Sequence, residues 1–418
     1  MPSYIIEGGR RLEGEVNVSG SKNASLPIMA ATILNSGVTK LYNIPEIRDT
    51  KITQEILRFL GCKVKKNNGK LEINSKHINR KEIPEHLMHQ MRSTVILAGA
   101  LIGRFKEARF SYPGGCDIGA RPIDLHLESF KKLGVNIEEK AGFIVCRCDK
   151  IVGANIDLDF PSVGATENII LASVYAEGIT KVSNAAMEPE IVDLADCLNK
   201  MGAKIEGAGT NIIQITGVKK LKDISYTVMP DRIEAGTLLC MAAATGGKVK
   251  LTNMVPEHIS PVLNKLKECG CKIEETKNTV YIDAPKRLKA VDIKTMPYPG
   301  FPTDMQSVFA SMLTTAKGTS MIIENIFENR YRYIPELKRM GVKANIEGRT
   351  AVITGVRKLS GATVKSTDLR GGAALIVAGL MAKSKSKIID IEYILRGYEN
   401  LDQKLRKLGA NINKEEGD

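Results

Sequence analysis

The sequence predicts an α/β protein with two domains, each an inside-out α/β barrel in which strands surround buried parallel helices. Three observations lead to this fold class: the chain length, a unit repeated six times, and a nearly apolar helix that recurs once per unit. At 418 residues the chain is too long for one ordinary core, which favours two large domains. Six repeats of a βαβαββ-type unit give three units per domain.

A charged amphipathic segment that ends in apolar-Gly-x-x-apolar marks each repeat. A last turn rich in Lys and Arg, followed by a glycine able to adopt the left-handed conformation, is typical of a helix end. We therefore expect a helix before each glycine and a strand after it. The successive glycines are 73, 68, 68, 71 and 68 residues apart, and they are Gly61, Gly134, Gly202, Gly270, Gly341 and Gly409.

A second kind of helix is predicted once per unit. These segments are nearly apolar on every side and contain many small residues, so each must be buried all round. They comprise residues 23–34, 91–102, 165–176, 232–244, 304–316 and 369–382. Short runs rich in β-branched residues between the helices, such as 248–253 and 320–325, predict strands on the outside.

We place the chain crossover near residues 228–231, after the third repeat. The expected domains are then 22–230, which carries the loop with Cys116, and 1–21 together with 231–418. The segment before Lys22 would complete the second domain. The active site is expected in the cleft between the two domains.

The net charge of +13 favours anionic partners, which could be a nucleic acid, a membrane surface or a phosphorylated small molecule. The basic residues are dispersed, Trp is absent and aromatic residues make up 5% of the chain, so we expect no nucleic-acid partner. Apolar windows such as 373–382 are about half the ~20 residues of a membrane span, and the N-terminus resembles no secretory signal. We therefore expect no membrane partner and a cytoplasmic location.

Eight cysteines without a secretory signal are expected to be reduced thiols, mostly buried. Cys146 with Cys148, and Cys269 with Cys271, have a one-residue gap that could suggest metal ligands. Neither pair has a histidine nearby, and in a strand this gap only places two thiols on one face. We expect no metal site.

Polar residues interrupt the apolar pattern at the starts of the buried helices. Helix N-termini offer unpaired N–H groups and partial positive charge, so several starts that face one cleft would bind an anion. The residues at these starts are Lys22-Asn23, Arg92, residues 162–167, Asp231-Arg232, Thr303-Asp304 and residues 368–370. A second set, Arg48, Cys116 to Arg121, Arg330 and Arg396, recurs where a strand meets an amphipathic helix. Each of these arginines alone could be a solvated surface charge.

Cys116 lies in a loop with three glycines, at residues 114–121. Arg121 in the same loop favours the thiolate, whereas Asp117 opposes it, and the setting is that of a reactive cysteine. The alternative is a passive loop cysteine.

Together these motifs resemble the enolpyruvyl transferase family over the whole chain. The most specific are 19–24 (SGSKNA), 113–116 (PGGC), 121–126 (RPIDLH), 162–168 (SVGATEN), 231–234 (DRIE), 301–304 (FPTD), 327–330 (FENR), 367–370 (TDLR) and 396–398 (RGY). The resemblance implies two similar domains that close around the substrates and no metal or organic cofactor. It also implies transfer of the enolpyruvyl group from phosphoenolpyruvate to UDP-N-acetylglucosamine, an early step of peptidoglycan synthesis that fosfomycin blocks.

The resemblance also implies residue roles. Cys116 would protonate phosphoenolpyruvate, Asp304 would accept the proton of the sugar hydroxyl, and Lys22 and Arg396 would complete the catalytic set. Asp368 with Leu369 would support the loop near Cys116. The phosphoenolpyruvate site would contain Lys22, Asn23, Arg92, Arg121, Arg330, Arg370 and Arg396. The UDP-sugar site would contain Asn23, Arg92, Arg121, Pro122, Ile123, Asp124, Leu125, Ser162, Val163, Gly164, Asp304 and Ile326.

Two positions depart from the family pattern. Phe160 stands where some members carry a lysine near the nucleotide, and Arg48 stands where lysine is common, which keeps the charge and changes its geometry. The nearest alternative is the sister enzyme that makes 5-enolpyruvylshikimate 3-phosphate, but Cys116 and the run from Gly164 to Thr166 argue against it. A silent repeat scaffold is a further alternative. The oligomeric state stays open, and a monomer is compatible with the sequence.

Overall fold

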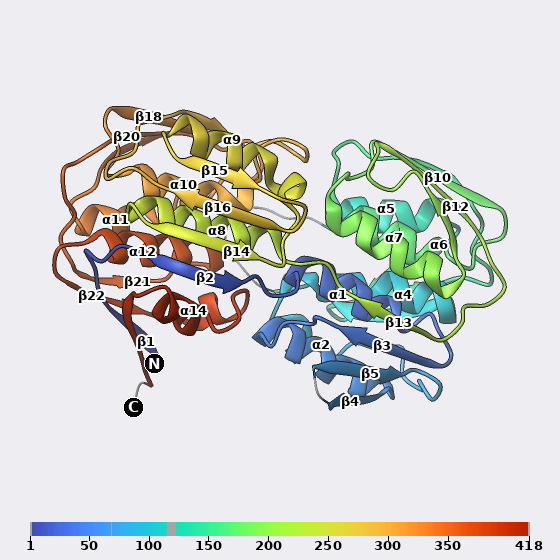
Figure 1. Cartoon of the computed structure of the whole chain (residues 1–418). Coiled ribbons are helices and arrows are strands. Elements are labelled where there is room, and N and C mark those ends of the chain that lie inside the picture. Colours follow the sequence, from blue (N-terminus) through green and yellow to red (C-terminus); the bar gives the residue numbers. More distant parts are fainter. Residues whose placement is uncertain (1, 68, 115–122, 417–418) are drawn as a thin grey trace. The chain divides into compact units, whose positions relative to one another are not determined.

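The computed structural model describes residues 2–67, 69–114 and 123–416. The described chain forms two compact units (Figure 1). Unit 1 contains residues 2–19 and 230–416, and unit 2 contains residues 20–114 and 123–229. The chain therefore passes between the units at 19–20 and at 229–230.

Unit 2 is built from three repeats, each with one buried helix and a small sheet. Its helices are α1 (Lys22–Ala31), α2 (Arg48–Leu60), α3 (Glu85–Met88), the 3-10 helix η1 (Arg92–Val95), α4 (Ile96–Phe105), α5 (Asp124–Lys132), α6 (Val163–Ser173) and α7 (Pro189–Met201). Its strands are β3 (Val38–Tyr42), β4 (Lys63–Asn67), β5 (Lys70–Asn74), β6 (Glu107–Ser111), β7 (Asn136–Lys140), β8 (Phe143–Arg147), β9 (Asn155–Asp157), β10 (Ile179–Ser183), β11 (Lys204–Glu206), β12 (Ile212–Thr216) and β13 (Ile224–Thr227). The sheet orders are β13-β3-β5-β4, β6-β8-β7 and β11-β12-β10-β9.

Unit 1 repeats this plan. Its helices are α8 (Arg232–Ala244), the 3-10 helix η2 (Pro256–Ile259), α9 (Ser260–Glu268), α10 (Thr303–Leu313), α11 (Ile334–Arg339), α12 (Leu369–Met381), α13 (Glu392–Leu395) and α14 (Leu401–Lys407). Its strands are β1 (Ser3–Glu7), β2 (Glu13–Asn17), β14 (Lys248–Thr252), β15 (Lys272–Glu275), β16 (Thr279–Asp283), β17 (Ile293–Lys294), β18 (Thr319–Ile323), β19 (Lys343–Glu347), β20 (Thr350–Thr354), β21 (Thr363–Lys365), β22 (Lys385–Ile389) and β23 (Asn411–Glu415). The sheet orders are β15-β16-β14-β2, β17-β18-β20-β19 and β21-β22-β1-β23.

The N-terminal strands belong to unit 1. Strand β1 lies between β22 and β23 and pairs antiparallel with both, and β2 pairs parallel with β14. The first residues of the chain thus complete two sheets formed mainly by its last half.

Five of the predicted buried helices are confirmed, and the region predicted as a helix over 91–102 is instead the 3-10 helix η1 followed by α4. In unit 1, α8, α10 and α12 are surrounded by sheets, and α1, α4 and α6 are the equivalent helices of unit 2 (Figure 1). In α4 and α6, Gly99 lies beside Asn168 and Gly103 beside Leu171, so the two helices run in the same direction. The same holds for α10 and α12, because Asp304 near the start of α10 accepts from Arg370 near the start of α12, and Ser311 farther along α10 donates to the carbonyl of Ala374 farther along α12. Within each unit, the starts of these helices therefore lie at the same end.

The glycine caps are also confirmed. All six repeat glycines have a positive φ between 87° and 109°, the left-handed region in which a side chain would be strained. In the described part of the chain, no helix is both long enough and apolar enough to span a membrane.

Candidate active site

Three charged side chains meet at the starts of α10 and α12 in unit 1. The Oδ1 of Asp304 accepts a hydrogen bond from Arg330 at 2.7 Å, and its Oδ2 accepts one from Arg370 at 2.9 Å. The arginine side chains are 2% and 4% exposed, whereas that of Asp304 is 27% exposed. Two buried guanidinium groups therefore hold one carboxylate that solvent can reach.

Nearby acidic groups raise the pKa values of both arginines. Burial alone would lower the pKa of Arg330, but the carboxylates of Asp304, Asp368 and Glu324 outweigh it and raise that pKa. The pKa of Arg370 is likewise raised, with Tyr398 and Asp304 outweighing burial. The Nε–H groups of both arginines are buried and have no hydrogen-bond acceptor in the part of the chain that the structure describes. Buried donors without acceptors are rare, and here they favour a site for an anion.

Aspartates cap the helices at this end. Asp231 accepts from the backbone N–H groups of Ile233 and Glu234 at the start of α8. Asp368 does the same for Arg370 and the following residue at the start of α12. These carboxylates stabilise the helix starts because they satisfy N–H groups that have no partner within the helix. They also fix the backbone from which Arg370 extends.

Glu324 supports the site from β18, and sequence reasoning did not single it out. Its side chain is buried and accepts from Thr295, from Thr303 and from the backbone N–H groups of Ile326 and Phe327. It joins the start of α10 to the turn that carries Ile326. The signal in the sequence that could have indicated this role is a glutamate directly after the apolar run of β18.

Arg396 and Ile326 are half-buried, and Arg396 follows the last residue of α13. Arg232, at the first position of α8, lies with its guanidinium 5.6 Å from the ring centroid of Tyr298. The structure brings Asp304, Arg330 and Arg370 into direct contact. For Arg396, the structure shows only that this residue lies in the same unit.

Unit 2 has its own set of polar helix starts. Lys22 is the first residue of α1, and its Nζ lies 3.1 Å from the carboxylate of Asp49. Asn23 follows it and is half-buried. Arg92 opens η1 immediately before α4, and burial lowers its pKa.

The start of α6 is formed by half-buried Ser162, Val163 and Gly164, with Ser162 as the cap that accepts from Ala165 N. One turn on, Glu167 is buried, and burial raises its pKa well above the usual value, with Glu190 adding to the effect. The N–H groups at this helix start, which have no partner within the helix, are suited to an anion.

The start of α5 carries three predicted residues. Ile123 is buried, Asp124 is exposed and Leu125 is half-buried. Cys116, Arg121 and Pro122 lie outside the described residues. The seven described cysteines are free thiols, and burial raises the pKa of each of them.

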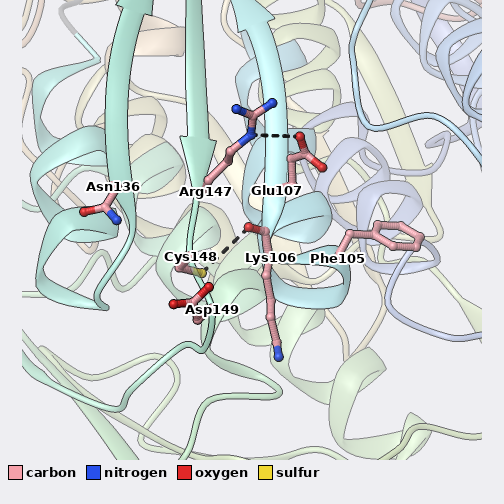
Figure 2. Close-up of a pocket in the computed structure, with 7 residues that line it drawn as sticks. All are labelled: Phe105, Lys106, Glu107, Asn136, Arg147, Cys148 and Asp149. Atoms are coloured by element: carbon pink, nitrogen blue, oxygen red, sulfur yellow. Dashed lines mark hydrogen bonds and ion pairs between the residues drawn. The ribbon is translucent and has the colours of Figure 1, made fainter.

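A pocket of about 280 Å³ lies at the opposite end of α4 (Figure 2). Cys148 lines it, with its thiol directed at the backbone carbonyl of Lys106, and Arg147 pairs with Glu107. Helix C-terminal ends carry partial negative charge, and the carboxylates of Glu107 and Asp149 also line this pocket. This pocket is therefore a poor candidate for the anion site. Among the described residues, no group of three or more His, Cys, Asp or Glu side chains is arranged to hold a metal ion.

Comparison with known proteins identifies the family. Residues 6–415 match the family model of EPSP synthase (3-phosphoshikimate 1-carboxyvinyltransferase). The chain is 52% identical to UDP-N-acetylglucosamine 1-carboxyvinyltransferase 2 of Caldanaerobacter subterraneus subsp. tengcongensis, covering 99% of each chain. It is 47% identical to the UDP-N-acetylglucosamine 1-carboxyvinyltransferase of Clostridium botulinum, again covering 99% of each.

Solved structures agree with this. The enolpyruvyl transferase NikO of Streptomyces tendae has a TM-score of 0.90 at 26% identity, with 99% of both chains covered. An EPSP synthase of Acinetobacter baumannii has a TM-score of 0.76 at 18% identity over the full length of both chains, which indicates a shared fold. The chain therefore belongs to the EPSP synthase family of enolpyruvyl transferases, and within that family it groups with the UDP-N-acetylglucosamine 1-carboxyvinyltransferases.

Proposed function

We propose that this chain transfers the enolpyruvyl group of phosphoenolpyruvate to the 3-hydroxyl of UDP-N-acetylglucosamine and releases phosphate. The observation that carries the chemistry is the carboxylate of Asp304, held by two buried arginines at the starts of α10 and α12. The acceptor follows from the relatives at about half identity, which are named for UDP-N-acetylglucosamine. The reaction would be an early step of peptidoglycan synthesis.

Asp304 has the properties of a positioned base. Arg330 and Arg370 fix both of its oxygens, and the carboxylate is the most exposed of the three side chains, so a sugar hydroxyl can approach it. Both oxygens are thereby held in place, as a positioned proton acceptor requires. In the proposal Asp304 accepts the proton of the 3-hydroxyl as that oxygen attacks.

Phosphoenolpyruvate carries a phosphate and a carboxylate, two groups that arginine binds in a forked geometry. The unpaired Nε–H donors of Arg330 and Arg370 in unit 1 support such binding. We assign Arg396 to the same set, and from unit 2 we add Lys22, Asn23, Arg92 and Arg121. UDP-N-acetylglucosamine is assigned to Ile123, Asp124, Leu125, Ile326 and the start of α6 at Ser162.

The proposed reaction is an addition followed by an elimination. Cys116 delivers a proton to the methylene carbon of phosphoenolpyruvate, and the sugar oxygen forms a bond to the neighbouring carbon as it loses its proton to Asp304. A proton then leaves the new methyl group, the carbon–carbon double bond re-forms, and the carbon–oxygen bond to phosphate breaks. Positioned acid and base groups supply these proton transfers.

Phosphate release from phosphoenolpyruvate tests the assignment. The purified chain should release phosphate with UDP-N-acetylglucosamine and not with shikimate 3-phosphate. Activity with shikimate 3-phosphate alone would favour the sister enzyme, and activity with neither acceptor would refute the proposal. We further propose a cytoplasmic location, which the free state of the seven described cysteines supports.

A further inference from the structure

Strand β19 in unit 1 lies at the edge of its sheet. In the order β17-β18-β20-β19 it pairs with β20 along one side, and four of its five residues are exposed. An edge strand presents backbone N–H and C=O groups that another strand can bind. Proteins prevent such pairing with charged side chains, including charged side chains that point inward at the edge.

Five of the six repeats lack an apolar side chain at a position where β19 has one. A strand equivalent to β19 follows each repeat glycine, so the copies can be compared within one chain. The fifth residue after the glycine lies opposite a buried residue of the neighbouring strand, on the inner face of the sheet, wherever it is part of the strand. This residue is charged in four copies, a glycine just beyond β11 in one, and an isoleucine in β19: Lys66, Glu139, Gly207, Glu275, Ile346 and Lys414.

Ile346 is 38% exposed, although its neighbour across the strands, Ala351, is fully buried. In the other four strands that extend this far, the charge at this position would be buried by a further strand, which opposes pairing. Strand β19 lacks this protection and offers an exposed apolar side chain at the same place.

The hairpin between β19 and β20 determines which backbone groups are free. Glu347 pairs with Thr350 across a two-residue turn, so residues 343, 345 and 347 direct their N–H and C=O groups toward β20. Ala344 and Ile346 direct theirs away from the sheet. Within the described residues, the N–H groups of these two form no backbone hydrogen bond outside the strand.

The side chains of β19 are complementary to those of a second β19. In an antiparallel pair centred on Asn345, Lys343 of each copy lies opposite Glu347 of the other. On the inner face, Ile346 of each copy lies opposite Ala344 of the other, and the two isoleucines are diagonal neighbours. Opposite charges and apolar side chains across an antiparallel pair both stabilise it. The free N–H and C=O groups of Ala344 and Ile346 meet in the same register, which gives four backbone hydrogen bonds.

The other five-residue strands at this position are not self-complementary. Strand β4 carries Lys63, Lys65 and Lys66, so two copies would repel each other. In the same central register, β7 would place Glu138 opposite a second Glu138, and β23 would place Ile412 opposite Lys414. The complementarity is therefore specific to β19 among these strands.

We propose that two copies of this chain associate through β19 in an antiparallel, two-fold symmetric pair. The two four-stranded sheets then form one sheet of eight strands. A two-fold contact uses both free edges and closes, so the association ends at the dimer. The pairing uses no residue that we assign to the substrates, and it can be tested separately from the proposed function.

Sedimentation velocity of the full chain measures this association. Small interfaces give weak complexes, so we expect a dissociation constant on the order of 10–100 µM and a rise from monomer to dimer between about 1 µM and about 200 µM. Hydrogen–deuterium exchange at the N–H groups of Ala344 and Ile346 should become slower over the same range, because these groups are bonded only in the dimer.

Charge reversal tests the register. Lys343→Glu places acidic residues opposite one another, and Glu347→Lys places lysines opposite one another, so each variant alone should dimerise about tenfold more weakly or worse. An equimolar mixture of the two restores opposite charges at both positions and should form a heterodimer within a few-fold of the unmodified affinity. This heterodimer would also show that both variants are folded.

Two further variants complete the test. Ile346→Lys introduces the inward charge found in other repeats and should weaken the dimer by more than about tenfold. Lys63→Glu, at the equivalent of Lys343 in the first repeat, is the matched control and should leave the dimer unchanged. A chain that stays monomeric over the whole range would overturn the inference. So would a mixture of the two charge variants that associates no better than either alone, or a dimer that Ile346→Lys leaves intact.

Discussion

Replacing Asp304 with asparagine should destabilise unit 1 and remove activity. The substitution keeps the size of the side chain and removes the single negative charge that pairs with Arg330 at 2.7 Å and Arg370 at 2.9 Å. Removing one partner of a buried ion pair costs about 3–5 kcal/mol because the other charge stays buried. Since Asp304 is partly exposed, we expect the lower end, about 3 kcal/mol. For a unit of this size the melting temperature should fall by roughly 6–12 °C.

Calorimetry gives the melting temperature, and hydrogen–deuterium exchange shows which unit is affected. Amides of α10 and α12 should exchange faster in Asp304→Asn, and those of unit 2 should not change. Inorganic phosphate should protect the variant more than the unmodified protein, since two buried guanidinium groups then need an anion. Glu268→Gln removes one partner of an exposed pair with Lys265 in the same unit and should cost less than about 1 kcal/mol. A loss below 1 kcal/mol for Asp304→Asn would refute the account of this site.

Three further predictions concern the cysteines, a second buried pair and pH. Iodoacetamide at neutral pH should modify Cys116 and spare the seven described cysteines, because burial raises the pKa values of those seven thiols. If peptide mass spectrometry finds as much labelling in Cys116→Ser as in the unmodified protein, the prediction is wrong. Lys404→Met leaves the buried carboxylate of Glu234 without its cation, so urea unfolding should show that the free energy of unfolding falls by about 3–5 kcal/mol. The control Lys387→Met, in an exposed pair, should lower it by less than about 1 kcal/mol, and equal losses in the two variants would contradict the prediction. The pKa of His126 is lowered from 6.5 to about 4 by burial and a neighbouring arginine, so its protonation favours the unfolded state. The stability of unit 2 should therefore be fully present above pH 6.5 and fall by up to about 3 kcal/mol as the pH drops to 4. His126→Asn should lack this slope, and an unchanged pH profile would refute the assignment.

The fold could be predicted because its signals are local. A helix that is apolar on every side must be buried, and the predicted helix 232–244 has the same bounds in the structure. Each repeat glycine ends a helix because the backbone there has a positive φ, which glycine adopts without strain. The region predicted as a helix over 91–102 is instead a 3-10 turn, Arg92–Val95, followed by α4. The side chain of Asn168 bridges the backbone of α4 at this junction.

The parts of the site that could not be predicted depend on which elements pack together. Recurrence at helix starts indicated Asp304 and Arg370, and recurrence where a strand meets an amphipathic helix indicated Arg330. The sharing of one carboxylate by both arginines follows instead from the packing of α10 on α12. Glu324 looked like the end of a strand, although it holds the start of α10 and the following turn. The role of Asn168 depends on the close approach of α4 and α6 at Gly99, which no local pattern encodes.

Direct analysis of the product tests the central claim. When the chain is incubated with phosphoenolpyruvate and UDP-N-acetylglucosamine, mass spectrometry and NMR should find an enolpyruvyl ether at the 3-oxygen of the sugar and one phosphate released per product. Asp304→Asn and Cys116→Ser should form neither. If the active chain leaves UDP-N-acetylglucosamine unmodified while it consumes phosphoenolpyruvate, the helix starts described above do not bring an enolpyruvyl donor and a nucleotide sugar together, and the account is wrong.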